Sequence, residues 1–213
     1  MANKKTIITI GRQFGSGGHE IGATIAQDLG INLYDKEMLK RAAKESGLCE
    51  ELFETHDEKP TYSFLYSLVM DTYSFGNYAA APFLDMPLNH KVFLAAFDAI
   101  KSVADQGPCV IVGRIADYVL RNHQPLVSVF ITADMDDRVK RIMEYENIDA
   151  QQAANLIKKV DKMRSSYYNF YSEKTWGSAD SYQLCINTSK VGIEAAAQLV
   201  MQYVEKICAN SAK

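Results

Sequence analysis

The sequence predicts an α/β fold in which helices cover both faces of a parallel β-sheet, formed as a single domain over residues 1–213. Two observations predict it. A run of five β-branched residues, residues 6–10, leads through a glycine-rich turn into a helical pattern. After it, short apolar runs alternate with amphipathic helical segments to the end of the chain. Such alternation is typical of parallel strands joined by crossover helices.

The composition is that of an ordinary globular domain, with 47% hydrophobic and 23% charged residues. The formal net charge of −3 gives no basic surplus, so nucleic acid is not an expected partner. No apolar run is long enough to span a membrane, and the amino terminus MANKKT lacks the apolar region of a signal peptide. We therefore expect no membrane association and a cytoplasmic location.

The four cysteines are far apart and form no C-x-x-C pair. This pattern favours reduced thiols over a disulfide framework or a zinc site, as expected in the cytoplasm. Cys109 and Cys185 lie in apolar runs and are predicted to be core residues.

The first strand and the first helix enclose a predicted phosphate site. The helical pattern of Ile21, Ile25 and Leu29 ends at Gly30, a typical helix stop. Glycines let the backbone approach an anion with its N–H groups, and the helix N-terminus adds partial positive charge. The alternative to a phosphate site is a tight turn whose glycines serve only to allow positive φ. The glycines between strand and helix are Gly11, Gly15, Gly17 and Gly18.

Two classes of phosphate loop fit these glycines. The Walker A pattern GxxxxGK[ST] fits poorly, because Gly18 or His19 takes the lysine position, depending on the anchor. A dinucleotide-type spacing is followed by Asp35 at the distance of a ribose-binding acid. That spacing is made by Gly11, Gly15 and Gly17.

The segments after the first helix follow in order. Residues 31–34 form a short strand, and residues 36–45 form an amphipathic helix. Residues 50–60 are acidic and read as a helix end with a loop. The aromatic stretch 62–75 is predicted to pack against the core, although it also fits the wall of a base pocket. Residues 76–89 contain two prolines and read as a loop.

Strands and helices alternate in the second half as well. Its predicted strands are 108–112, 126–131 and 184–187. Its predicted helices are 91–106, 115–121, 134–146 with Asp134 as the N-cap, a long tract from 150 towards 175, and 193–207.

Positive charge follows two of these strands. Arg114 comes directly after VIVG, at the carboxyl-end rim where ligands bind in open α/β sheets. Arginine there is suited to a bidentate phosphate contact. Arg138 and Arg141 are three residues apart and share one helix face.

The whole chain resembles the cytidylate kinase-like proteins, a branch of the P-loop nucleoside monophosphate kinases. Six stretches in the same order carry the resemblance. They are ITIGRQFGSGGHEIG, LYDKEML, VIVGR, VFITADMDDRVKRI, the pair Asp161-x-x-Arg164, and LCINTS. Ile115 stands where the Asp of the bacterial Gly-Arg-Asp motif lies, and His19 or Glu20 stands at the Mg²⁺-binding Ser/Thr, with Ser16 a substitute candidate.

The resemblance implies a P-loop NTPase-type sheet with a helical acceptor-binding insertion at 36–89 and a lid-like helical region at 138–176. It implies ATP-dependent phosphoryl transfer to a nucleoside monophosphate, CMP or dCMP first, with ATP and Mg²⁺ as cofactors. Arg12 would offset γ-phosphate charge, and Asp35 and Arg114 would hold the acceptor. The lid arginines would be Arg138, Arg141 and Arg164, and the residues around the ATP phosphates would be Gly15, Ser16, Gly17, Gly18 and His19.

Two other functions are open at this point. A catalytically weak nucleotide-binding or regulatory protein of the same fold is motivated by the missing Walker lysine. A dinucleotide-dependent reductase is more remote, because no lysine in the chain has a tyrosine four positions before it. Enzymes of that kind with this glycine spacing use a Tyr-x-x-x-Lys pair.

Overall fold

The computed structural model describes residues 6–35, 88–113 and 115–211. Its centre is a parallel five-stranded sheet in the order β2-β3-β1-β4-β5. In the register of the central strands, Ile7 lies opposite both Cys109 and Leu126. The predicted parallel sheet is therefore confirmed. Its strands are β1 (Ile7–Arg12), β2 (Asn32–Tyr34), β3 (Cys109–Val112), β4 (Leu126–Thr132) and β5 (Leu184–Asn187).

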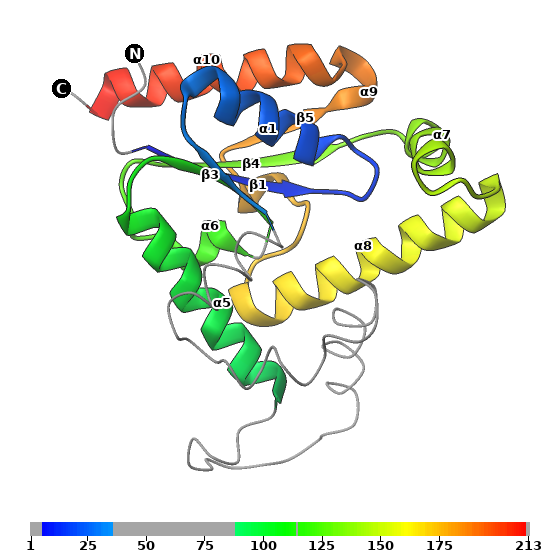
Figure 1. Cartoon of the computed structure of the whole chain (residues 1–213), viewed down its shortest axis with the longest axis horizontal. Coiled ribbons are helices and arrows are strands. Elements are labelled where there is room, and N and C mark those ends of the chain that lie inside the picture. The colour runs from blue at the N-terminus through cyan, green and yellow to red at the C-terminus, as the bar shows by residue number, and fades with distance from the viewer. Residues whose placement is uncertain (1–5, 36–87, 114, 212–213) are drawn as a thin grey trace.

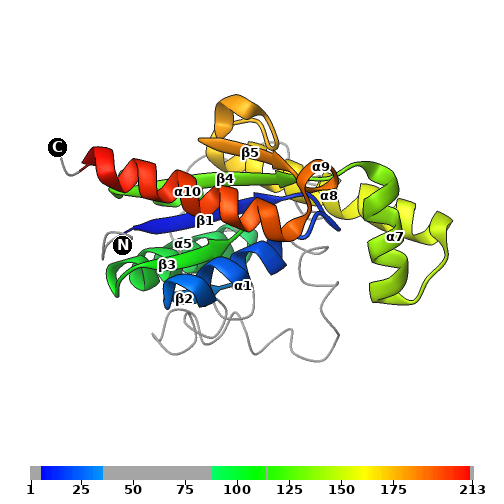
Figure 2. The same ribbon diagram turned by 90° about the horizontal axis from the view of Figure 1, so that it is seen from above.

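Helices cover both faces of the sheet, as predicted (Figures 1 and 2). On one face lie α1 (Gly18–Leu29) and α10 (Ile193–Ser211). On the other lie α5 (Leu88–Asp105), α6 (Ala116–Val119) and α8 (Ala150–Ser172). The alternation of side chains along β1 feeds both cores, because Ile7 belongs to the α5–α6 side while Ile8 and Ile10 belong to the α1–α10 side.

A third apolar cluster lies beyond the carboxyl ends of the strands. There α7 (Met135–Glu146) packs on α8 through Ile142, Ala153 and Ile157, with Phe14 against them. This cluster brings α7 and α8 to the end of β1, where the glycine-rich turn begins (Figure 1). The fold therefore places the predicted lid helices beside the predicted phosphate loop.

Helix ends follow the sequence signals in most places. Gly30 ends α1 with φ of +64°, and Asp149 begins α8 with a capping box to Gln152. Asp134 lies at the N-cap of α7, as predicted, but its carboxylate caps nothing. It accepts hydrogen bonds from Asn187 and Lys190 instead, which ties the start of α7 to the end of β5.

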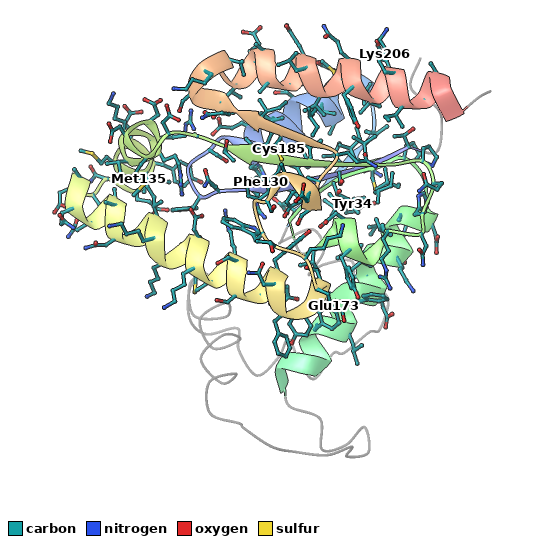
Figure 3. The ribbon with its side chains drawn as sticks, turned by 180° about the vertical axis from the view of Figure 1, so that it is seen from behind. Tyr34, Phe130, Met135, Glu173, Cys185 and Lys206 are labelled. Carbon is teal, nitrogen blue, oxygen red and sulfur yellow. The ribbon has the colours of Figure 1, made fainter. Side chains whose placement is uncertain are left out.

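Some predictions are wrong in detail. The helix predicted to begin at residue 91 begins at Leu88, inside the predicted loop. Cys185 lies on β5, an edge strand of the described sheet, and is exposed (Figure 3). Cys109 is buried, as predicted. The short α9 (Thr188–Val191) and the 3₁₀-helix at Ala179–Ser181 were not foreseen.

The predictions for 36–45, 50–60 and 62–75, most of 76–89, and Arg114 lie outside the described residues. The single domain and the acceptor-binding insertion stay predictions. Within the described ranges, no helix has the length and apolar character of a membrane span.

Candidate functional site

The phosphate loop, residues 12–18, connects β1 to α1 and needs its glycines for two reasons. Gly15 and Gly17 both have φ of +80°, a region that L side chains rarely adopt. Gly18 does not have positive φ, but a Cβ there would lie 2.6 Å from Arg12 Cβ. Close packing, and not dihedral freedom, therefore keeps a side chain out of Gly18, one of the two positions that the Walker lysine could take.

The carbonyl groups of residues 12–16 all accept hydrogen bonds, four of them from side chains outside the loop. Arg164 Nη1 donates to the Arg12 oxygen at 3.2 Å, and Ser16 Oγ donates to the Gln13 oxygen at 2.8 Å. The next three carbonyls accept from Arg138 Nε at 2.8 Å, Arg141 Nη1 at 2.5 Å and Thr188 Oγ1 at 2.9 Å. These oxygens belong to Phe14, Gly15 and Ser16.

The N–H groups around the start of α1 have no such partners. Among the described residues, no acceptor lies within hydrogen-bond geometry of the N–H of Gly15, Gly17, Gly18 or His19. They gather at the N-terminus of α1, where the helix dipole is positive. A loop with satisfied carbonyls and unsatisfied N–H groups has the hydrogen-bonding character of an anion site.

The three predicted lid arginines meet at the phosphate loop, but on its carbonyl side. Arg138 is 5% exposed and forms an ion pair with Asp161. Asp161 Oδ1 also accepts from the Phe14 N–H at 2.8 Å. Arg138 is therefore a buried support of the loop in this structure, and Asp161 is its partner. The sequence placed Asp161 three residues before Arg164 but gave no sign of its contact with the loop.

Other predicted residues occupy different positions. Ser16 is fully buried and its hydroxyl donates to Gln13, so the side chain is not turned out towards a metal ion. His19 lies in the first turn of α1, with Nε2 3.2 Å from Asp35 Oδ2. The side chains of His19 and Asp35 are 57% and 29% exposed. Asp35, predicted to hold an acceptor, thus reaches the rim of the loop.

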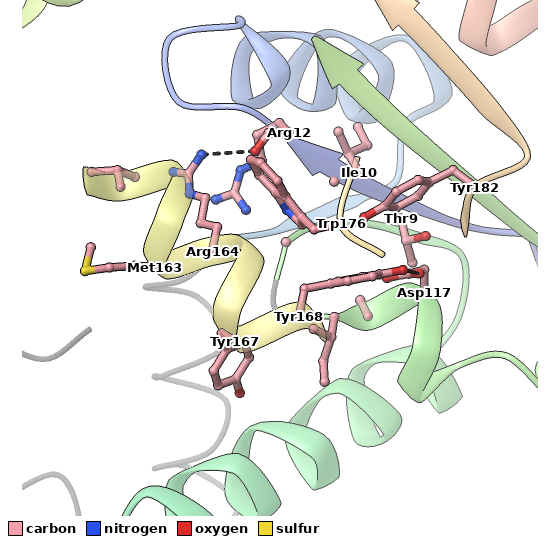
Figure 4. Close-up of a pocket in the computed structure, with 15 residues that line it drawn as sticks. Thr9, Ile10, Arg12, Asp117, Met163, Arg164, Tyr167, Tyr168, Trp176 and Tyr182 are labelled. Atoms are coloured by element: carbon pink, nitrogen blue, oxygen red, sulfur yellow. Dashed lines mark hydrogen bonds between the residues drawn. The ribbon is translucent and has the colours of Figure 1, made fainter. Parts of the chain in front are cut away.

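A cavity of about 140 Å³ opens at the carboxyl ends of β1 and β3 (Figure 4). Arg12 and Arg164 reach it, and Arg12 lies so close over Gly113 that a Cβ there would overlap its Nη1. Asp117 lies at another part of its wall. The aromatic residues that line the cavity are Tyr167, Tyr168, Trp176 and Tyr182.

Asp117 is a buried carboxylate, 7% exposed, at the start of α6. Its Oδ2 accepts from the Tyr168 hydroxyl at 2.7 Å and lies 3.8 Å from Lys174 Nζ. Burial raises the pKa of Asp117, and the contacts with Tyr168 and Lys174 oppose part of that rise. The Tyr182 hydroxyl is also buried and has no hydrogen-bond partner in the described part of the chain. The cavity therefore offers a carboxylate and a phenol to a ligand.

Sequence reasoning missed this group of cavity residues. Asp117 was readable only as a charged residue in the apolar stretch IADYVL, shortly after the Gly-Arg pair. Its partner Tyr168 is 51 residues away, so no local pattern joins the two.

A second opening, a groove of about 340 Å³, lies between α7 and α9. It is lined by Arg141, Thr188, Ser189 and Gly192, among others. The groove begins beside the phosphate loop, since a Cβ on Gly17 would lie 3.6 Å from Arg141 Nη1. The loop thus has the groove on the β5 side and the cavity on the β3 side.

The strand order argues against the dinucleotide alternative. The usual dinucleotide-binding sheet places β1 beside β2, in the order 3-2-1-4-5-6. Here β3 separates them. Gly11 also lacks positive φ and serves close packing, because a Cβ there would lie 2.8 Å from Phe130 Cδ2.

Comparison with known proteins gives one family. The model of a group described as the cytidylate kinase-like family matches residues 7–190. A cytidylate kinase of Staphylothermus marinus is 28% identical over 105 residues, which are 47% of this chain and 56% of that protein. The chain thus spans little more than half the length of this curated relative.

Solved structures show the same fold. An uncharacterized protein from Eubacterium ventriosum is 31% identical with a TM-score of 0.71, over 94% of this chain and 98% of that chain. A shikimate kinase from Acinetobacter baumannii, in complex with shikimate, is 12% identical with a TM-score of 0.53, over 96% of this chain and 95% of that one. A shikimate kinase from Bacteroides thetaiotaomicron is 13% identical with a TM-score of 0.51, over 94% and 98%. These neighbours confirm a kinase-like α/β fold.

Proposed function

The chain belongs to the cytidylate kinase-like family, and from that membership we propose that it transfers the γ-phosphoryl group of ATP to a nucleoside monophosphate, with CMP or dCMP first. The observation that carries this proposal is the phosphate loop. The carbonyls of residues 12–16 accept hydrogen bonds, while the N–H groups of Gly15, Gly17, Gly18 and His19 are without acceptors in the described residues.

The donor fits the loop and the groove. The ATP phosphates would bind to the N–H groups at the start of α1, where backbone and helix dipole both favour an anion. The nucleoside part would then extend into the groove on the β5 side, past Arg141 and Thr188.

In this proposal the acceptor occupies the cavity on the β3 side. Its phosphate would lie at Arg12 and Arg164, the two arginines that line the cavity. Its base would lie among the aromatic walls, near Asp117 and the Tyr182 hydroxyl. We keep Arg114 and Asp35 as proposed acceptor-side residues, Arg114 from its place after VIVG and Asp35 from its place at the rim of the loop.

The chemistry asks little of the protein beyond positioning and charge. An oxygen of the acceptor phosphate attacks the γ-phosphorus, the bond to the β–γ bridging oxygen breaks, and ADP leaves. The acceptor phosphate is already ionised at neutral pH, so no general base has to remove a proton. Arg12, next to both loop and cavity, would neutralise charge between the two phosphates.

Mg²⁺ is expected from the family and would supply further charge neutralisation on the ATP phosphates. The described residues contain no group of three or more His, Cys, Asp or Glu side chains arranged around a metal position. The hydroxyl of Ser16 is engaged with Gln13. We therefore assign no protein ligand to the metal and derive no step through it.

A nucleotide-binding protein with little kinase activity is the second candidate. The observation that favours it is the packing of Arg12 Cβ against Gly18, which leaves no room for a lysine at that position. In this case ATP binds to the loop but the transferring group lacks a cation from the helix side.

The two candidates are separated by incubating ATP with each common nucleoside monophosphate and measuring ADP release. We expect release that depends on the acceptor and is greatest with CMP or dCMP. Gly17→Ala should abolish it, because φ is +80° and the new Cβ would lie 2.7 Å from Ile193 Cδ1. Gly30→Ala is the matched control, with φ of +64° but nothing within 4 Å. ATP binding without acceptor-dependent release would support the second candidate.

A further inference from the structure

Asp161 and Arg138 form a buried ion pair between α8 and α7, with side chains 16% and 6% exposed. Removing such a pair from water is unfavourable unless the remaining donors and acceptors are satisfied. Here the remaining hydrogen-bonding groups of the pair are satisfied by the backbone of one residue of the phosphate loop, Phe14. Asp161 Oδ1 accepts from the Phe14 N–H, and Arg138 Nε donates to the Phe14 carbonyl, each at 2.8 Å. We call these two side chains and Phe14 the Phe14 clamp.

The clamp fixes the direction of the next N–H group. A peptide unit is planar and trans, so its C=O and N–H point in opposite directions. Because Arg138 holds the Phe14 carbonyl on the α7 side, the N–H of Gly15 must point away from α7. Gly15 could otherwise turn easily, since glycine has the widest choice of backbone dihedrals.

Thr188 orients a second N–H group of the loop in the same way. Its Oγ1 donates to the Ser16 carbonyl at 2.9 Å, so the N–H of Gly17 points to the opposite side. Of the four N–H groups with no acceptor in the described chain, those of Gly15 and Gly17 are therefore each oriented through the carbonyl that precedes them.

We propose that Asp161 is a positioning residue for the phosphate loop, which directs the Gly15 N–H towards the phosphates through Arg138 and Phe14. The inference rests on the proposed function in one respect, because it takes these N–H groups to be the site that binds the phosphates. It gives Arg138 a different role from the one expected for a lid arginine, since Arg138 acts on the loop carbonyl and not on the transferring group.

A double variant separates positioning from stability. Arg138→Met with Asp161→Leu replaces the ion pair by apolar side chains, a change that in other proteins is often neutral or stabilising for the fold. The Phe14 N–H and carbonyl then lose their partners, and the loop loses its orientation. Lys162→Ala, an exposed neighbour on α8, is the matched control.

The first measurement is the affinity for inorganic tripolyphosphate, with thermal unfolding measured on the same samples. We expect the double variant to stay folded, with a lower unfolding temperature because the Phe14 backbone loses two hydrogen bonds, and to bind tripolyphosphate about tenfold or more weakly, as for loss of a hydrogen bond to a charged group. Lys162→Ala should match the wild type in both. A folded double variant with wild-type affinity overturns the proposal.

The second measurement needs no ligand. Amide hydrogen exchange of Phe14 should accelerate at least tenfold in the double variant while amides of α10 keep their protection. Unchanged exchange at Phe14 overturns the proposal even if the protein proves not to be a kinase. A third outcome is that the wild-type protein does not bind tripolyphosphate, while Phe14 exchange still accelerates in the double variant. The proposed function then fails. The clamp would only stabilise the loop, so its role in positioning an N–H group for phosphate is overturned as well.

If the double variant does not fold, the single variant Arg138→Lys tests the positioning role instead. Lysine keeps the charge opposite Asp161 but has no Nε–H for the Phe14 carbonyl. We expect weaker tripolyphosphate binding with Phe14 exchange unchanged, because Asp161 still accepts from the Phe14 N–H. Wild-type affinity in this variant contradicts the positioning role.

Discussion

Arg12 is the residue on which the proposed catalysis depends most. Its Cβ packs against Gly18 in the first turn of α1, and its guanidinium lies over Gly113 at the wall of the cavity. It thus reaches from the phosphate loop to the acceptor side. The charge that it provides therefore lies on the cavity side of the loop.

Arg12→Ala should lower kcat on the order of 10²-fold and change ATP affinity little, because the charge that it meets develops mainly in the transition state. Steady-state kinetics with CMP, together with equilibrium binding of ATP, make the comparison. Loss of ATP affinity with unchanged kcat would show that Arg12 binds the ground state and has no special part in transfer.

Asp117 gives a prediction about pH. Burial raises the pKa of its carboxyl in the folded protein, so the folded state holds its proton to higher pH than the unfolded chain does. Its contribution to stability is therefore present in acid and is lost as the pH rises through the folded-state pKa. As the pH rises above the ordinary carboxyl range, the unfolding temperature of Asp117→Asn should rise relative to that of the wild type. A constant difference across this range would mean that Asp117 does not titrate abnormally.

At the scale of the elements, α7 and α8 behave as one support for the phosphate loop. Arg138 and Arg141 from α7 and Arg164 from α8 each donate to a different loop carbonyl. The family resemblance implies that these arginines belong to a lid over the transferring group, and that role stays a prediction; in this structure they contact the loop itself. The sequence did not predict the side from which they approach, because that depends on how α7 packs on α8 and on the rotation of each helix.

The strands and long helices were predictable because their apolar periodicity is local. The run Leu126–Thr132 and the spacing of Ile21, Ile25 and Leu29 identify buried faces without any knowledge of partners. The four-residue α9 is too short to show a period. Cys185 was misjudged because edge and central strands of one sheet have similar apolar sequences.

The candidate site was predictable only in part, for a related reason. The glycines of the loop carry their signal in the chain itself, since Gly15 and Gly17 need positive φ. Asp161 and Asp117 act through partners 147 and 51 residues away. Contacts of that kind arise from tertiary packing, so neither contact can be read from the sequence, although Asp161 belongs to one of the stretches that carry the family resemblance.

At the scale of the whole molecule, the central feature is the position of the phosphate loop. It lies at the carboxyl end of the central strand β1, between a groove on the β5 side and a cavity on the β3 side. Ligands of open α/β sheets bind at this edge. Two nucleotides entering from the two sides would meet at the loop, which is the geometry that phosphoryl transfer between them requires.

The most direct test of this account is a crystal structure with a non-hydrolysable ATP analogue and CMP. We predict the phosphates of the analogue on the N–H groups of Gly15, Gly17, Gly18 and His19, its nucleoside in the groove, and the phosphate of CMP at Arg12 and Arg164 in the cavity. Analogue phosphates bound away from these N–H groups, or CMP bound outside the cavity, would contradict it.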